Sequence, residues 1–182
     1  MMTTKLPSRL HHTAYVSSDL EATRHFYEDI IGLPLSACWT EIDHLFGKDR
    51  TYCHLFFDLA DGSALAFFQF ADPEDQALFG PELPPSPFRH IALCVDKETQ
   101  AGIEERIQKA GIQPPKTYAL EHGYCRSVYV EDPDGMIVEF TCDDPRAASG
   151  AEERKAKAHA ELKRWLDGDH SNNNPFRHEE AA

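Results

Sequence analysis

An internal repeat constrains the fold of this chain more than any other feature. Residues 10–16 and 88–95 both read as short strands, and they align so that His12 corresponds to His90. Further along, residues 61–67 match residues 134–140 as a turn followed by a strand. A repeat of this length is typical of an architecture built from copies of one supersecondary unit. The sequence therefore predicts two similar modules.

Both halves continue from the first strand into a helix. The strand is followed by an acidic segment, and apolar residues then recur at the spacing of one helix face. In the first half, Ser18 and Glu21 have the spacing of a capping box. The helices are predicted to end at Gly32 and Gly111, because glycine readily adopts the left-handed conformation of a helix C-cap.

Each half has room for two more strands between its helix and its closing strand. The expected strands cover residues 35–42 and 52–59 in the first half and 116–120 and 126–130 in the second. Each module then has the order β-α-β-β-β. The predicted fold class is α+β, with two pseudo-symmetric βαβββ modules that form a cupped, open, mixed sheet.

The modules belong to one expected domain with a tail at each end. A connector with five prolines separates them, since a proline-rich segment cannot join the interior of a sheet. After the domain, residues 151–166 are rich in helix formers, and residues 167–182 have the composition of a disordered tail. The expected division is a tail at 1–9, a domain at 10–145 (module 10–71, connector 72–87, module 88–145), and a helix with tail at 146–182.

The composition of the chain limits the classes of partner that it can bind. Lys and Arg number 18 against 31 Asp and Glu, giving a formal charge of −13, which disfavours binding to a nucleic-acid backbone. The chain shows neither an N-terminal signal pattern nor an apolar stretch that could span a membrane, so we expect no membrane partner and a cytoplasmic location. The five scattered cysteines are typical of free thiols in a reducing compartment.

Three residues carry metal-ligand chemistry. His12 and His90 occupy equivalent strand positions, and they would face one cleft if the modules pair about a pseudo-twofold axis. Glu139 lies in an otherwise apolar strand, where a carboxylate needs a cation or hydrogen bonds to offset desolvation. Two imidazoles and one carboxylate form a facial ligand set that leaves coordination positions open. The repeat favours His12 over the neighbouring His11, and it places Ala66 at the position equivalent to Glu139.

These features together resemble the vicinal oxygen chelate superfamily, which includes glyoxalase I, bleomycin- and fosfomycin-resistance proteins and type I extradiol dioxygenases. The resemblance is carried by the segments LHHTA at 10–14, DLEATRHFYEDIIGL at 19–33, FRHIA at 88–92 and DPDGMIVE at 132–139. It implies a cupped sheet around one divalent metal with His12, His90 and Glu139 as the ligands. It also implies a small-molecule substrate and, by analogy, a homodimer. Whether the modules pair within one chain or between two chains is left open.

Within that superfamily, a second pattern resembles the extradiol ring-cleavage signature. His122 and Tyr129 precede Glu139 at the expected spacing, and the resemblance implies that they handle protons and hold a substrate oxygen. We therefore expect an extradiol-type Fe(II) dioxygenase acting on a vicinal diol or a similar oxygen-chelating aromatic. Fe(II) is the favoured metal, with Mn(II), Zn(II) or Ni(II) as alternatives. The chain departs from the pattern at Leu120 and at Ser63, and His54 is a candidate substitute for the histidine expected near Ser63.

Two other classes of function remain open, one enzymatic and one of binding alone. One is a glyoxalase-like lyase, isomerase or epimerase, although Ala66 argues against glyoxalase I itself. Fosfomycin-type thiol transfer is less expected, because no basic cluster for an anion is evident in so acidic a chain. The other is a metal-free drug-binding resistance protein, for which an aromatic cleft is suggested by Phe56, Phe57, Phe67, Phe68 and Phe70.

Overall fold

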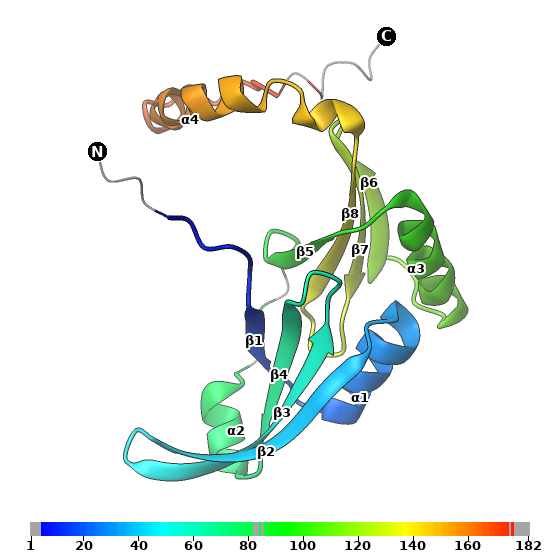
Figure 1. Ribbon diagram of the computed structural model, residues 1–182, viewed down its shortest axis with the longest axis vertical. Coiled ribbons are helices and arrows are strands. Elements are labelled where there is room, and N and C mark those ends of the chain that lie inside the picture. The colour runs from blue at the N-terminus through cyan, green and yellow to red at the C-terminus, as the bar shows by residue number, and fades with distance from the viewer. Residues whose placement is uncertain (1–4, 82–83, 85, 175, 177–182) are drawn as a thin grey trace.

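The computed structural model describes residues 5–81, 84, 86–174 and 176. The chain forms two four-stranded sheets with the orders β1-β4-β3-β2 and β5-β8-β7-β6 (Figure 1). The first sheet consists of β1 (His12–Val16), β2 (Leu35–Leu45), β3 (Lys48–Asp58) and β4 (Ala64–Phe70). The second consists of β5 (His90–Cys94), β6 (Thr117–Glu121), β7 (Cys125–Glu131) and β8 (Ile137–Asp143).

The two sheets repeat each other in topology and in register. In both, the first strand pairs in parallel with the last, and the other neighbours are antiparallel. Ala14 lies opposite Ala66 in the first sheet, and Ala92 lies opposite Glu139 in the second. The predicted α+β fold of two βαβββ modules is confirmed, and so is the equivalence of Ala66 and Glu139.

The first helix differs in detail from its prediction. It begins as α1 (Leu20–Arg24) and continues as the π-helix η1 (His25–Ile31), ending at Gly32 with φ of 93°. The predicted capping box is wrong. Asp19 caps the helix, because its carboxylate accepts the backbone N–H groups of Glu21 and Ala22. The Ser18 hydroxyl donates instead to Asp134 in the second module.

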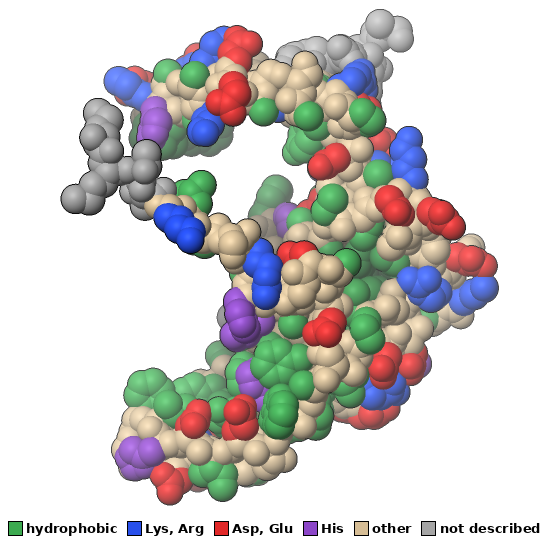
Figure 2. All heavy atoms as spheres, in the orientation of Figure 1, with side chains coloured by type: hydrophobic (Ala, Val, Ile, Leu, Met, Phe, Trp, Pro, Cys, Tyr) green, Lys and Arg blue, Asp and Glu red, His purple; other side chains and the backbone are tan. Residues whose placement is uncertain are grey.

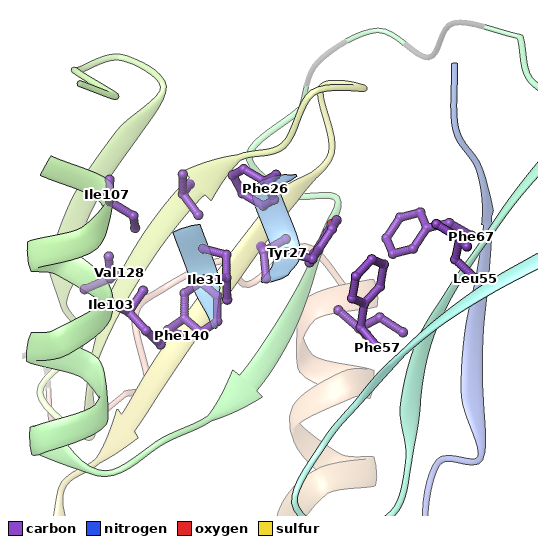
Figure 3. Close-up of a cluster of buried hydrophobic side chains, with 13 residues drawn as sticks. Phe26, Tyr27, Ile31, Leu55, Phe57, Phe67, Ile103, Ile107, Val128 and Phe140 are labelled. Atoms are coloured by element: carbon purple, nitrogen blue, oxygen red, sulfur yellow. The ribbon is translucent and has the colours of Figure 1, made fainter. Parts of the chain in front are cut away.

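Helix α3 (Lys97–Lys109) joins the second module to the first. Its N-cap is Asp96, and α1 and α3 lie on the same side of the two sheets (Figure 1). Arg106 of α3 donates to the backbone carbonyls of Ile30 and Ile31 at the end of η1. One buried cluster includes residues from both modules, among them Tyr27, Phe57, Ile103 and Phe140 (Figure 3). The modules therefore share a hydrophobic core behind their sheets.

The connector and the C-terminal segment also depart from expectation. The connector contains a helix, α2 (Pro73–Phe79), which Asp72 caps and in which Pro73 occupies the first turn. Helix α4 (Ala151–Leu166) matches its prediction and follows a short 3₁₀-helix, η2 (Pro145–Ala148). Part of the predicted disordered tail is ordered, since Arg164 donates to the Asp169 and Ser171 carbonyls. Residues 175 and 177–182 of that tail lie outside the described residues.

No helix in the described part of the chain is both long and apolar enough to cross a bilayer.

Asp132 connects the modules through a buried carboxylate. Tyr27 of η1 donates its hydroxyl to Asp132 Oδ2 at 2.9 Å, and Asp132 Oδ1 accepts the backbone N–H of Met136 at 2.8 Å. Asp132 is only 3% exposed. Burial raises the pKa of Asp132 to about 6, although hydrogen bonds from Met136 and Tyr27 oppose the shift. The folded protein therefore binds this proton more tightly than the unfolded chain does.

This shift predicts a loss of stability as the pH rises. The contribution of protonated Asp132 is fully present below about pH 4 and disappears as the pH passes 6, amounting to about 3 kcal/mol for a two-unit shift. Asp132→Asn keeps the shape of the side chain but cannot ionise. Urea unfolding between pH 4 and 7.5 should show the wild type losing stability relative to this variant. Parallel curves for the two proteins would contradict the prediction.

Candidate metal centre

The candidate site lies on the face of the second sheet that points away from α3. On β7 and β8, Val128 and Phe140 point toward the shared core with α3. Tyr129 and Glu139 are paired with each other on these strands and point to the opposite face, because side chains alternate along a strand. We call this face of each sheet the inner face. Figure 2 shows histidine side chains near β1 and β5, beside the hydrophobic surface of the first module.

His90 and Glu139 form the centre of the site. The distance from His90 Nε2 to Glu139 Oε2 is 2.9 Å, and the side chains are 30% and 8% exposed. His90 Nδ1 lies 2.9 Å from the carbonyl oxygen of Pro87, which can only accept a hydrogen bond. Nδ1 therefore carries a proton. This contact orients the ring so that Nε2 faces the carboxylate.

The two oxygens of Glu139 have different surroundings. Oε1 accepts hydrogen bonds from the hydroxyls of Thr141 at 2.7 Å and Tyr129 at 3.0 Å, whereas Oε2 faces His90. Burial raises the pKa of Glu139, but hydrogen bonds from Ser127, Thr141 and Tyr129, together with the charge on His90, leave the net pKa below its usual value. Glu139 is therefore an anion at neutral pH although it is buried.

This donor set fits a divalent cation. Ligand atoms that bind one divalent ion at roughly 2.1 Å lie about 3.0 to 3.4 Å from one another, and His90 Nε2 and Glu139 Oε2 are separated by 2.9 Å. The hydrogen bond from Nδ1 to a backbone carbonyl is the usual outer contact of a histidine ligand. Thr141 and Tyr129 hold the carboxylate from behind in the same way. The fit covers two of the three predicted ligands.

Hydrogen bonds connect Tyr129 and His122 to Glu139. The Tyr129 hydroxyl donates to Glu139, and it lies 3.0 Å from His122 Nε2. Burial, followed by the hydrogen bond to Glu139, raises the pKa of Tyr129 to about 12. The phenol thus keeps its proton at neutral pH, and His122 Nε2 is the donor to the phenol oxygen. The ring of Tyr118 stacks on Tyr129, with centroids 4.8 Å apart.

His12 lies in the first module. It is exposed on β1, its Nδ1 is 2.7 Å from His11 Nδ1, and its ring contacts the ring of His54 at 6.4 Å between centroids. His54 is in turn held by Glu41, 3.0 Å from its Nδ1. The described residues of one chain contain no group of three or more His, Cys, Asp or Glu side chains able to hold a metal ion. One chain thus groups four of the five predicted site residues and leaves His12 apart.

The sequence analysis missed two residues of the site, Ser127 and Thr141. Their hydroxyls lie 3.1 Å from each other and both stabilise the Glu139 carboxylate. A signal for them is present, because each is two residues from a predicted site residue and so shares its strand face. Polar residues at such positions are candidates for the outer contacts of a metal ligand.

Comparison with a family model assigns the chain to a protein superfamily. The model described as the Glyoxalase/Bleomycin resistance protein/Dioxygenase superfamily matches residues 9–140. That range includes all eight strands, at least in part, and all five predicted site residues. The chain belongs to this superfamily, as its sequence resemblance implied.

Individual relatives of the chain share only low sequence identity with it. Glutathione transferase FosA of Serratia marcescens is 28% identical over 131 residues, covering 72% of this chain and 78% of the relative. The uncharacterised protein YwbC of Bacillus subtilis is 28% identical over 142 residues, covering 74% and 98%. A point mutant of the fosfomycin resistance protein FosX of Listeria monocytogenes, in complex with Mn(II) and a dihydroxypropylphosphonic acid, has a TM-score of 0.54 at 21% identity and covers 78% and 95%. The FosX likeness shows the fold alone.

Proposed function

We propose that this protein is a divalent-metal-dependent enzyme that binds an oxygen-chelating aromatic substrate. The observation that carries the proposal is the pairing of His90 with the ionised, buried Glu139, backed by Tyr129 and His122. A purely structural ion pair would not need a hydrogen-bonded histidine and tyrosine beside it. The alignment of polar groups on one sheet face is typical of a built site.

We further propose that a second copy of the chain completes the ligand set with its His12. Within one chain, His12 belongs to a different sheet from His90 and Glu139. His12 is exposed and therefore accessible to another molecule. In a symmetric dimer the contact would be reciprocal, so two equivalent sites would form. Under this proposal the modules that share a metal come from two different chains.

The residues of the site support extradiol-type dioxygenation. Fe(II), when bound, would supply a centre at which two adjacent substrate oxygens and dioxygen can meet. Tyr129 presents a protonated phenol, and its hydrogen bond to Glu139 can be exchanged for one to a substrate oxygen. His122, hydrogen-bonded to that phenol, is placed to act as a general acid or base.

The inner face of the first module suits an aromatic substrate. The His54 ring stacks on Phe68, with centroids 3.8 Å apart, and contacts Phe56 at 4.1 Å. Trp39, directly opposite His54 on β2, is 58% exposed. In the proposed dimer this face turns toward the metal ligands of the other chain. Flat aromatic walls favour a flat aromatic ligand, because offset stacking buries apolar area.

Oxygen uptake tests the proposed reaction. Protein reconstituted anaerobically with Fe(II) is mixed with air-saturated buffer and a panel of catechols, and oxygen consumption is followed. We expect uptake with at least one catechol, and its loss in the Tyr129→Phe and His122→Ala variants by about 100-fold, the usual contribution of a general acid or base. Absence of uptake with every diol, together with turnover under Zn(II) or Ni(II), would instead support a glyoxalase-like lyase or isomerase.

A second candidate is transfer of a thiol to a small electrophile. Its support is the 28% identity with glutathione transferase FosA. The same protein, loaded with Mn(II), is incubated with fosfomycin and glutathione, and adduct formation is followed by mass spectrometry. Adduct formation without oxygen uptake would replace the dioxygenase proposal with this one. Tight binding of an aromatic drug by metal-free protein, without turnover, would indicate a resistance protein that acts by binding.

A further inference from the structure

Two thiols lie next to each other on the first sheet, outside the candidate metal centre. Cys38 of β2 and Cys53 of β3 have their sulfur atoms 3.6 Å apart. Cys38 pairs with Leu55, and Cys53 pairs with Thr40, so the two cysteines are diagonal neighbours on the same face of the hairpin. Cys38 is exposed and Cys53 is half-buried. Sulfur atoms at this distance are in contact but not bonded, because a disulfide bond is about 2.05 Å long.

We propose that Cys38 and Cys53 form a reactive dithiol that a hydroperoxide converts into a disulfide across β2 and β3. The Cys38 sulfur attacks the peroxide, the O–O bond breaks, and Cys38 becomes a sulfenic acid while water or an alcohol leaves. The Cys53 sulfur then attacks the Cys38 sulfur, the S–O bond breaks, and a second water leaves. In total, two thiols and one hydroperoxide give one disulfide, one water or alcohol, and one water.

The surroundings of the two sulfurs assign their order of reaction. The exposed Cys38 is the one that a peroxide in solution can reach. Burial, together with the hydrogen bond to Cys38, raises the pKa of Cys53 to about 11, so Cys53 remains a thiol and is a poor first nucleophile. Its contact with Cys38 makes it the resolving thiol once the sulfenic acid has formed.

The dithiol is placed where a crosslink would affect the inner face. Trp39 and His54, which follow Cys38 and Cys53 in the chain, lie directly opposite each other on β2 and β3. A bond between the two sulfurs would link β2 to β3 covalently, on the face of the hairpin opposite the Trp39 and His54 side chains. Because His54 contacts His12, the disulfide would lock the strands next to the exposed histidine of the first module.

Peptide mapping of the oxidised protein tests the proposal without any variant. The purified, fully reduced wild-type chain is treated with hydrogen peroxide, blocked with an alkylating agent, digested and analysed by mass spectrometry. We expect a peptide pair linked through Cys38 and Cys53, lighter by two hydrogen atoms than the reduced pair and separated again by dithiothreitol. The fluorescence of Trp39, measured in a Trp165→Phe background, should fall on oxidation and recover on reduction.

Three results would overturn it. They are a sulfinic or sulfonic acid at Cys38 with Cys53 still alkylated, a disulfide between two chains, and a link to Cys94, Cys125 or Cys142 in place of the expected pair. The Cys53→Ser variant should stop at the sulfenic acid of Cys38, detectable with a dimedone probe. As a matched control, Cys94→Ser, which changes an exposed cysteine of β5, should form the Cys38–Cys53 disulfide as the wild type does.

Discussion

Glu139→Gln should lower metal affinity by at least about 100-fold, and turnover should fall with it, since even the outer contacts of a metal ligand are worth 10- to 100-fold. The amide has nearly the shape of the carboxylate and can still accept the hydrogen bond from Thr141. It lacks the negative charge that offsets the cation. Its nitrogen, which would take the place of Oε2 beside His90, has no lone pair with which to bind a metal. The measurement is metal content by elemental analysis after desalting, together with thermal stabilisation by added Fe(II) or Mn(II).

A control variant separates this effect from the general loss of an ion pair in the second module. Glu104 of α3 forms two hydrogen bonds with Arg126, at 2.8 and 2.9 Å, on the helix-covered side of the second module. Glu104→Gln should change stability by about 1 kcal/mol or less, as expected for a part-exposed pair, and should leave metal content unchanged. If Glu139→Gln retains wild-type metal content, Glu139 is not a ligand and the proposed centre is wrong.

The repeat allowed much of the fold to be predicted from the sequence. His12 aligns with His90, and this alignment fixed the register of two sheets that the structure confirms at Ala66 and Glu139. The prediction worked because strand alternation has a period of two, so one aligned residue assigns a face to every other residue of its strand. The same rule places Ala14 on the face of His12 and Ala92 on the face of His90.

Local competition between similar groups explains what the sequence did not reveal. Ser18 and Asp19 are both good N-caps, and the choice of Asp19 depends on Asp134, a residue distant in sequence that binds Ser18. Helix α2 was missed because prolines dominate the connector, although an Asp-Pro start is typical of a helix N-terminus. Such choices depend on tertiary contacts, which a single sequence does not display.

The relative placement of the modules was the largest gap in the site prediction. Pseudo-twofold symmetry is satisfied whether the modules pair within one chain or across two, because the same strand faces meet in either case. The decision depends on packing between helices: Arg106 of α3 binds the end of η1, and the side chains of both helices share one core. The pairing of β5 with β8 brings His90 and Glu139 together within the second sheet, and His12 lies on the first sheet.

Mixing two inactive variants should therefore restore activity. In the proposed symmetric dimer, His12→Ala and Glu139→Gln each damage both sites. In a mixed dimer, however, one site receives the intact His12 of the Glu139→Gln chain and the intact His90 and Glu139 of the His12→Ala chain. Random reassociation makes half of the dimers mixed, with one intact site in each, so about a quarter of wild-type activity should return. Mixed dimers purified through two different tags should contain about one metal ion per dimer.

The matched control uses two lesions in the same module. Mixing His90→Ala with Glu139→Gln leaves one damaged ligand in every site of the mixed dimer, so neither activity nor metal content should return. Both pairs contain Glu139→Gln and differ only in the module that carries the second lesion, which excludes a general benefit of mixing. If each site were formed by one chain alone, the His12→Ala and Glu139→Gln pair would stay as inactive as its parents. Equal recovery in both pairs would contradict the exchange of His12 between chains, because only that exchange makes the position of the second lesion matter.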